Sequence, residues 1–359
     1  MNFQKVHIIG IGGISMSGIA KILLNRGYKV SGSDIKNNEQ VKILKKLGAE
    51  IYIGHRASNL KNIEAVVYTN AVDKDNIELQ TARNKDIKIY KRAEFISELF
   101  KDKKTIAVTG THGKTTTTSM LATIFVNAKQ EPSVMVGGNL DIIDGNIKSG
   151  KGDIFITEAD ESDGSLTFFD PHYAVLTNIE WDHFNYYKNK KDLIAKFTEF
   201  INKIPPEGAL TVWGKVLEEY PQLDKYSTNI STYGLSNEDY TARNINLLSY
   251  TSSFDLYHEN KKIGTVQLQV PGLHNILNAL AAFVTSKEAG LSTEEIIEGL
   301  DKYQGVKRRF EKKGKFNGAL IVDDYAHHPT EIINTIKTAQ GTKAKKLYVV
   351  FQPHRYSRT

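Results

Sequence analysis

Short apolar runs alternate with longer amphipathic segments along the first part of the chain. The apolar runs are VHIIG, YKVSGS, EIYIG and AVVYTN, and the spacing of apolar positions between them predicts helices over 16–25 and 39–47. Such alternation is typical of a parallel sheet covered by helices. The pattern ends near Leu99, where the charged cluster KDKK at 101–104 indicates a linker. We therefore expect a first α/β domain over 1–99.

The pattern predicts two further domains. The segment 100–304 begins with a strand, TIAVTG, continues with the buried-strand runs IFITEAD and YAVLTNI, and is rich in β-type sequence between 209 and 270. A basic, glycine-punctuated stretch at 305–318 indicates a second boundary. The remaining segment, 305–359, predicts the strands ALIVDDY and KLYVVFQ with a helix from about Thr330 between them.

Composition narrows the function classes. A length of 359 residues is enough for more than one hydrophobic core, and no apolar run approaches the ~18 residues of a membrane span. The chain has no cysteine, which excludes disulfides and thiolate chemistry. The net charge of +6 is modest and suits phosphate-bearing substrates better than nucleic acid. We expect a cytoplasmic protein without membrane insertion; no oligomeric state is indicated.

A candidate phosphate loop lies between an apolar strand and an amphipathic helix. In such a loop, glycines allow close backbone approach, a lysine reaches terminal phosphates and a threonine hydroxyl binds magnesium. The strict G-x-x-x-x-G-K-[ST] pattern is not met, because Val108 occupies the first glycine position. The alternative is an ordinary strand-helix turn with an exposed lysine. The candidate nucleotide-binding residues are Gly110, Thr111, His112, Gly113, Lys114, Thr115 and Thr116.

A second glycine-rich turn follows the first strand. Gly10, Gly12 and Gly13 precede a predicted helix, Asp34 closes the second strand, and Ser15 stands where the third glycine of a dinucleotide fingerprint is expected. This pattern alone predicts a dinucleotide site. With a phosphate loop in the next domain, the first domain is free to hold a different nucleotide-linked group.

Acidic and histidine side chains follow two further strands, in ITEADESD and TNIEWDHF. Glu158 and His183 should project toward the same sheet edge as the phosphate loop. Glu158 suits magnesium, which prefers hard oxygen ligands, whereas His183 is as consistent with a hydrogen-bonding role as with a ligand. Asp160, Glu161 and Asp163 are interpreted as a solvated acidic turn.

Two further segments carry polar side chains at helix starts. In VPGLHNILNALAA, His274 and Asn278 share a helix face and Asn275 lies beside them; capping and a polar helix face would explain these residues equally well. In LIVDDYAHHPTEI, a strand-helix loop before Pro329 carries candidate ligand-binding residues or a helix-capping histidine pair. These residues are Tyr325, His327 and His328, and the terminal FQPHRYSRT adds Arg355 and Arg358, which can fork onto carboxylate or phosphate oxygens.

Taken together, these motifs resemble those of the Mur ligases from the first strand to the last residue. The strings GIGGISMSGIA, TGTHGKTTTT, EADESD, TNIEWDH, PGLHNILNA, GVKRRFE, DDYAHHPTE and FQPHRYSRT occur in the order and spacing of that family. The resemblance implies an α/β protein with a Rossmann-like UDP-substrate domain, a central phosphate-loop ATPase domain and a Rossmann-like C-terminal domain. The third domain would be incomplete, because family members continue well beyond this point.

The resemblance also implies an activity and residue roles. GTHGKT and DDYAHHP point to the branch that joins L-alanine to UDP-N-acetylmuramate with ATP and Mg²⁺; a branch that recycles a whole peptide shares several of these strings. Lys114, Thr115, Glu158 and His183 would hold phosphates and metal. The adenine would lie at His274, Asn275 and Asn278, the UDP group at Gly10, Gly12, Gly13 and Asp34, and the alanine or phosphoryl group at Tyr325, His327, Arg355 and Arg358.

Two rival classes remain at this stage. A nicotinamide-dependent oxidoreductase would explain the first glycine turn and Asp34 but leaves the phosphate loop without a task. A non-catalytic UDP-sugar binding protein would explain an incomplete third domain, although such a protein has no physical need for Lys114, Glu158 and His183.

Overall fold

The computed structural model describes residues 3–182, 186–226 and 229–353, and the chain divides into two compact units. The first unit comprises residues 1–103 with the short segment 146–149, and the second comprises 104–145 and 150–359. The strand β8 (Gly145–Lys148) spans one of the points where the chain passes from one unit to the other.

The first unit is a five-stranded parallel sheet in the order β3-β2-β1-β4-β5. Apolar residues of the central strand, such as Ile8 and Ile9, are completely buried, as expected where helices cover both sheet faces. The elements are β1 (Lys5–Ile9), α1 (Ile14–Asn25), β2 (Lys29–Asp34), α2 (Glu39–Lys46), β3 (Glu50–Ile53), η1 (Ala57–Asn59), β4 (Ala65–Tyr68), α3 (Ile77–Asn84), β5 (Lys88–Lys91) and α4 (Arg92–Leu99).

The second unit is built on a large mixed sheet in the order β15-β14-β13-β12-β11-β10-β6-β9-β7. In this order, neighbouring strands from β7 to β13 pair in parallel, whereas β14 pairs antiparallel with β13 and with β15. The strands are β6 (Lys104–Thr109), β7 (Ser133–Leu140), β9 (Ile154–Glu158), β10 (Tyr173–Leu176), β11 (Ala209–Trp213), β12 (Ile230–Gly234), β13 (Tyr240–Leu247), β14 (Ser252–His258) and β15 (Lys261–Leu268).

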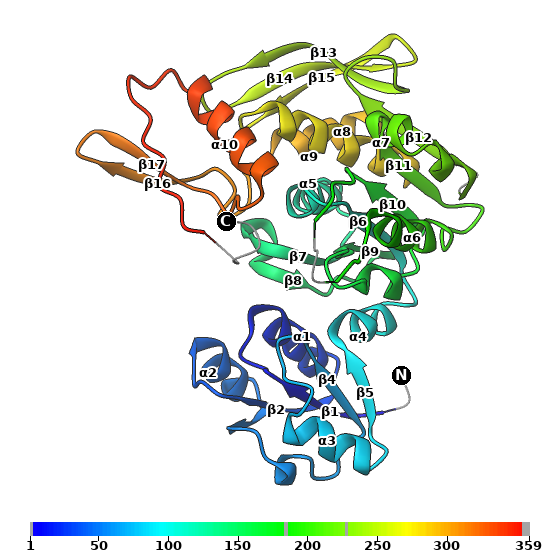
Figure 1. Cartoon of the computed structure of the whole chain (residues 1–359), viewed down its shortest axis with the longest axis vertical. Coiled ribbons are helices and arrows are strands. Elements are labelled where there is room, and N and C mark those ends of the chain that lie inside the picture. The colour runs from blue at the N-terminus through cyan, green and yellow to red at the C-terminus, as the bar shows by residue number, and fades with distance from the viewer. Residues whose placement is uncertain (1–2, 183–185, 227–228, 354–359) are drawn as a thin grey trace. The chain divides into compact units, whose positions relative to one another are not determined.

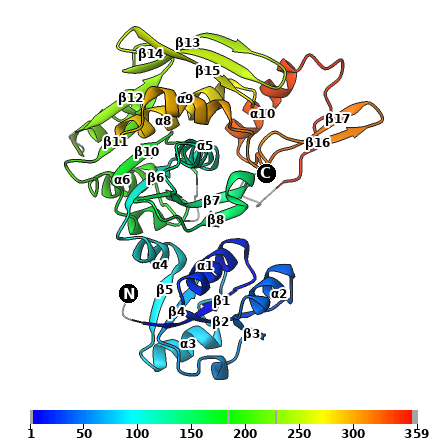
Figure 2. The same ribbon diagram turned by 180° about the vertical axis from the view of Figure 1, so that it is seen from behind.

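Three helices of this unit, α5, α8 and α9, lie together over the sheet (Figures 1 and 2). Met120, Phe125, Ile276, Phe283 and Leu300 from these helices belong to one buried apolar cluster with the sheet, which fixes α5 above the strands. The helices are α5 (Lys114–Asn127), η2 (Asp141–Ile143), η3 (Ser165–Phe168), α6 (Lys190–Ile201), α7 (Gly214–Glu219), η4 (Pro221–Tyr226), α8 (Leu273–Glu288) and α9 (Thr293–Asp301).

The C-terminal segment forms the hairpin β16 (Glu311–Phe316) and β17 (Ala319–Asp323), followed by α10 (Pro329–Gly341). The helix begins at Pro329 as predicted. The strand expected for KLYVVFQ is wrong: residues 346–352 are not in a strand, and Tyr348 and Val350 are 80% and 97% exposed. Its alternating apolar pattern suits a strand, but a strand needs a hydrogen-bonding neighbour, and no described segment pairs with this one.

The fold class is therefore α/β, with parallel strands and covering helices where the alternation predicted them. The domain boundaries at 99/100 and 304/305 remain predictions. Among the helices that the structure describes, none is long and apolar enough to cross a membrane.

Candidate active site

The phosphate loop connects β6 to α5 at the carboxyl edge of the large sheet. Gly110 and Gly113 adopt positive φ angles of 125° and 84°, and a Cβ on Gly110 would stand 2.2 Å from the Thr177 hydroxyl oxygen. A side chain at either position would be strained or would displace its neighbours, so the two glycines are needed for this tight turn. The helix α5 begins directly at Lys114, which places its free backbone N–H groups in the loop.

Lys114 is held by several partners within the loop. Its Nζ donates to the carbonyl oxygens of Gly110 at 2.6 Å and Thr111 at 3.3 Å, and to a Glu161 carboxylate oxygen at 2.7 Å. Burial by itself lowers the lysine pKa, but attraction to Glu161 and Asp160 outweighs burial and raises the pKa. Lys114 is therefore a charged ammonium at the cavity beside the loop.

The ion pair corrects one expectation. Glu161 was predicted to be part of a solvated acidic turn, yet it is only 1% exposed, and its backbone carbonyl accepts a hydrogen bond from the Tyr187 hydroxyl at 2.5 Å. The sequence pattern cannot show that the turn folds inward over Lys114. The run of acidic residues after an apolar strand resembled a solvent-exposed turn, whereas the lysine charge makes burial of one carboxylate tolerable.

Glu158 and Thr115 supply oxygen atoms beside the lysine. One Glu158 carboxylate oxygen accepts from the Gly137 backbone N–H at 2.5 Å and the other from the Thr115 hydroxyl at 3.2 Å. Burial raises the pKa of Glu158 in spite of these bonds and of the nearby Lys114. A hard divalent cation would compensate a carboxylate left in this state, so the pair Glu158 and Thr115 fits magnesium.

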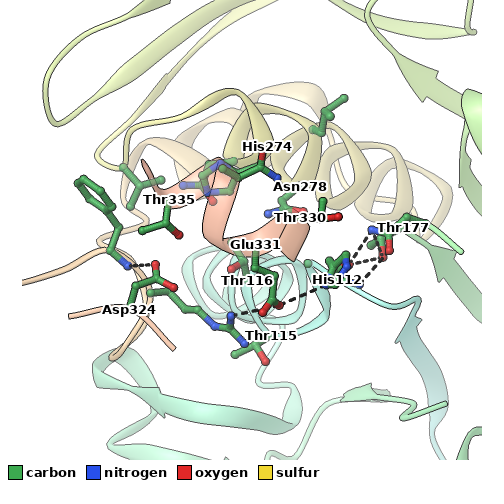
Figure 3. Close-up of a pocket in the computed structure, with 18 of the residues that line it drawn as sticks. His112, Thr115, Thr116, Thr177, His274, Asn278, Asp324, Thr330, Glu331 and Thr335 are labelled. Atoms are coloured by element: carbon green, nitrogen blue, oxygen red, sulfur yellow. Dashed lines mark hydrogen bonds and ion pairs between the residues drawn. The ribbon is translucent and has the colours of Figure 1, made fainter. Parts of the chain in front are cut away.

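Two cavities meet at the phosphate loop, and both lie within the second unit. The first, seen in Figure 3, is bordered by the loop, the start of α8 and the first turns of α10. Most of the predicted nucleotide-binding residues line it, together with aromatic side chains that the motifs did not indicate. The lining includes His112, Gly113, Thr115, Thr116, His274, Asn275, Asn278, Trp213, Tyr233 and Tyr303.

The polar side chains from α8 differ in their availability. Burial, assisted by nearby Arg309, lowers the pKa of His274 to about 4, so its imidazole is neutral. The Asn275 amide donates to the Pro271 carbonyl at 2.7 Å, and Asn278 accepts from the Thr117 hydroxyl at 3.3 Å. Capping by these side chains is not observed, because Gly272 occupies the N-cap. A neutral imidazole and flanking aromatic rings suit the uncharged heterocyclic base of a nucleotide.

The second cavity contains the charged groups. It is lined by Lys114, Glu158, Tyr325 and His327 together with Thr111, Asp160, Asp182, Lys307, Arg308, Arg309 and His328. The loop after β17 thus brings Tyr325 and His327 to the same cavity as the phosphate loop, whereas their expected contact with a substrate remains a prediction. His183, Arg355 and Arg358 lie outside the described residues.

Around His112, the structure assembles a cluster that the motifs did not predict. Its ring nitrogens lie 3.3 Å from oxygens of Glu180 and of Glu331, and the His328 ring lies 4.4 Å away, centroid to centroid. Burial lowers the pKa of His112, but the hydrogen bond to Glu180 and attraction to the Glu331 carboxylate outweigh burial and raise the pKa to about 9. His112, Glu180 and His328 are spaced closely enough to hold a metal ion. However, a protonated His112 is already paired with two carboxylates, which leaves no free ring nitrogen for a metal, and nitrogen ligands do not suit magnesium.

In the first unit, the predicted substrate residues lie at one sheet edge. The Gly12 N–H donates to Asp34 at 2.9 Å, and a Cβ on Gly12 would stand 2.9 Å from the same oxygen. The other Asp34 oxygen accepts from the Lys36 N–H at 3.0 Å. Asp34 therefore fixes the turn that carries Gly10, Gly12 and Gly13, and its expected contact with substrate remains a prediction.

The fold and this site define a nucleotide-binding α/β protein with a phosphate loop between two cavities. Comparisons with known proteins agree. Residues 5–104 match the model of the Mur ligase family catalytic domain, 108–286 the Mur ligase middle domain, and 308–358 the Mur ligase glutamate ligase domain. The chain belongs to the Mur ligase family.

Individual relatives narrow the comparison. The UDP-N-acetylmuramate–L-alanine ligase of Clostridium acetobutylicum is 48% identical over 99% of this chain and 78% of its own length. The crystal structure of UDP-N-acetylmuramate-alanine ligase from Thermotoga maritima is 32% identical, with a TM-score of 0.86 over 98% of this chain and 81% of that chain. A UDP-N-acetylmuramate:L-alanyl-gamma-D-glutamyl-meso-diaminopimelate ligase from Neisseria meningitides is 28% identical, with a TM-score of 0.77 over 85% of this chain and 100% of that chain.

Proposed function

We propose that this protein joins L-alanine to the carboxylate of UDP-N-acetylmuramate, using ATP, as a step in peptidoglycan precursor synthesis in the cytoplasm. The observation that carries the proposal is the meeting of Lys114, Glu158, Tyr325 and His327 in one cavity beside a phosphate loop. The similarity to alanine-adding ligases over 99% of the chain selects the substrates.

The reaction has two chemical steps. The muramate carboxylate attacks the γ-phosphate of ATP, which gives an acyl phosphate and ADP. The alanine amine then attacks the acyl carbon, and inorganic phosphate leaves. Because phosphoryl transfer requires alignment and charge neutralisation but no protein nucleophile, a chain without cysteine can catalyse it.

Each part of the site has a task in these steps. Lys114 and the α5 N-terminus neutralise the transferred phosphoryl group, and the cavity with His274 and Asn278 holds the adenine. Thr115 and Glu158 would hold Mg²⁺, which supplies further neutralisation of phosphate charge when bound. Tyr325 and His327 face the incoming amino acid. The roles expected for His183, Arg355 and Arg358 belong to the same proposal.

Ligand binding by the first unit is also part of the proposal. Gly10, Gly12 and Gly13 lie at the carboxyl edge of a parallel sheet, where the backbone can approach a pyrophosphate closely. The UDP group is the nucleotide-linked group that this edge would hold. A nicotinamide cofactor remains the alternative occupant, and a fluorescence titration with reduced nicotinamide that shows saturable binding would favour it.

The second candidate is ligation of a peptide beginning with alanine, favoured by the similarity to the Neisseria ligase. A phosphate-release assay with ATP and UDP-N-acetylmuramate, run with L-alanine and with an alanine-initiated tripeptide, separates the two. We expect L-alanine to be used far better. Equal or better use of the tripeptide would transfer the protein to the peptide-ligating branch, and no phosphate release with either would reject both.

A further inference from the structure

Glu331 stands between the two cavities. It lies in the first turn of α10, its side chain is 15% exposed, and it lines both the base-facing cavity and the cavity of Lys114. His112, Gly113, Thr115 and Arg309 are the other residues common to both linings. The two cavities are therefore separated by these few side chains, and a change in one cavity can affect the other through them.

The two carboxylate oxygens of Glu331 contact different parts of the chain. Oε1 lies 3.3 Å from Nδ1 of His112 on the phosphate loop and 3.6 Å from Nη1 of Arg309. Oε2 accepts from the backbone N–H groups of His327 at 3.2 Å and His328 at 3.5 Å. Figure 3 shows Glu331 directed from α10 toward His112. One side chain thus joins the phosphate loop to the loop that faces the amino acid.

The contacts continue at both ends. At the loop end, the His112 carbonyl accepts from the Thr177 hydroxyl at 2.6 Å, and its N–H donates to Asn178 Oδ1 at 2.9 Å. At the other end, Nδ1 of His327 lies 2.9 Å from the Tyr325 carbonyl oxygen. An unbroken series of polar contacts therefore runs from the end of β10 to Tyr325.

Charge strengthens the central link. The raised pKa of His112 keeps its imidazole protonated at neutral pH, and attraction to His112 and Arg309 holds the pKa of Glu331 below its usual range in spite of burial. Glu180 fixes the opposite ring nitrogen of His112 and accepts from the Thr330 hydroxyl at 2.7 Å. A pair of opposite charges with little access to solvent holds its two side chains in position more strongly than a neutral pair does.

We propose that Glu331 is a positioning residue, which couples the phosphate loop through His112 to the backbone of His327 and so sets the place of the amino-acid-facing loop. The proposal rests on the proposed function for the identity of the substrate. Nothing in it requires Glu331 to touch a substrate.

A purely structural role offers a competing explanation, because Glu331 also completes the capping box of α10. Glutamine serves in a capping box nearly as well as glutamate, so Glu331→Gln keeps the cap and removes the charge. The helix α9 provides a matched control. Its capping box uses Glu295, whose carboxylate accepts from the Ser292 N–H at 2.9 Å away from both cavities.

Steady-state kinetics test the coupling. We expect Glu331→Gln to raise KM for L-alanine about 10-fold and to lower kcat several-fold, with KM for UDP-N-acetylmuramate unchanged. Glu295→Gln should leave every constant as in the unsubstituted protein. Normal alanine kinetics in Glu331→Gln, or equal losses in the two variants, would overturn the proposal.

A double-mutant cycle tests the partner. If Glu331 acts through His112, then His112→Gln and the double variant His112→Gln/Glu331→Gln should each show about the same 10-fold rise in KM for L-alanine as Glu331→Gln alone. Independent effects would multiply to about 100-fold, and that result would reject His112 as the link.

Hydrogen exchange provides a readout that does not depend on ligase activity. Binding of a non-hydrolysable ATP analogue should slow amide exchange at residues 325–328 in the unsubstituted protein and in Glu295→Gln, but not in Glu331→Gln. If the proposed function is wrong but the coupling is right, phosphate release will be absent while the difference in amide exchange between the variants is still observed. Equal protection in all three proteins would overturn the coupling itself.

Discussion

Two carboxylates, one in each unit, have opposite titration behaviour. Glu78 in the first unit is fully buried, which by itself raises the carboxyl pKa, but hydrogen bonds from Ser33 and Asn59 and attraction to His7 outweigh burial and hold the pKa at about 2. Glu158 in the second unit has a raised pKa because the Gly137 N–H, Lys114 and Thr115 do not offset its burial. A carboxylate whose neighbours offset the cost of its burial stabilises the fold. A carboxylate whose neighbours do not offset that cost can bind a cation.

The geometry around Glu78 shows how complete this satisfaction is. Its oxygens lie 2.5 Å from the Ser33 hydroxyl, 2.6 Å from the Asn59 amide and 3.0 Å from His55 Nδ1. His7 Nε2 lies 3.6 Å away, and its other ring nitrogen contacts the Ser31 hydroxyl. This network joins α3 to strands β1 and β2, so we expect its loss to appear as lower stability and not primarily as lower turnover.

The largest expected effect follows from replacing Lys114, the lysine of the phosphate loop. Lys114→Ala should lower ligase turnover about 1000-fold, because it removes a fixed positive charge from the phosphoryl group. It also removes the ion pair between Lys114 and the buried Glu161 carboxylate, which should lower the melting temperature. The double variant Lys114→Ala/Glu161→Gln should recover stability but no activity. Thermal unfolding and phosphate release check the two parts, and a recovered rate would contradict a catalytic role for Lys114.

Glu78→Gln should lower the free energy of unfolding by about 3 kcal/mol at pH 7, because it breaks a buried hydrogen-bonded charge network. The pKa of Glu78 is lowered on folding, so its contribution is complete above about pH 4.5 and is lost as the pH falls toward about 2. The difference between variant and unsubstituted protein should therefore narrow over that interval. Urea denaturation at several pH values measures it; a constant difference would show that the charge is not responsible.

Glu158→Gln should lower turnover without lowering stability, the opposite of the effect expected for Glu78→Gln. We expect turnover to fall about 100-fold and to recover partly at high Mg²⁺ concentration, since one anionic ligand is lost. The free energy of unfolding should be unchanged or higher, because the native carboxylate is strained by burial. Calorimetry should show unaltered affinity for UDP-N-acetylmuramate; loss of that affinity would place Glu158 in a different role.

The smallest effect is expected at a buried group without a counter-charge. His274→Ala should raise KM for ATP about 10-fold with little change in kcat, because contacts with the base act equally on ground and transition states. Since burial lowers the His274 pKa to about 4, KM for ATP in the unsubstituted protein should not vary between pH 6 and 8 on account of this residue. Initial rates at varied ATP test both statements.

The strand-helix alternation, the phosphate loop and the sheet edge that carries Lys114 and Glu158 follow from the sequence alone. These features are local, because they depend on apolar spacing, on glycines such as Gly110 and Gly113 with positive φ, and on the parallel arrangement that alternation imposes. Local pattern therefore assigned Lys114 and Glu158 to one sheet edge, whereas Tyr325 and His327 were assigned to the same reaction only through the resemblance to the Mur ligases.

Only the tertiary structure decided which charges meet. Lys114 and Glu161 pair across 47 positions of the sequence. His112 pairs with Glu180 across 68 positions and with Glu331 across 219. The network around Glu78 reaches His55 and His7, which are 23 and 71 positions away. No sequence spacing encodes such contacts, because they depend on how separate elements pack. The segment KLYVVFQ shows the same limit from the other side: its alternation predicts a strand, but a strand forms only where the fold supplies a neighbour.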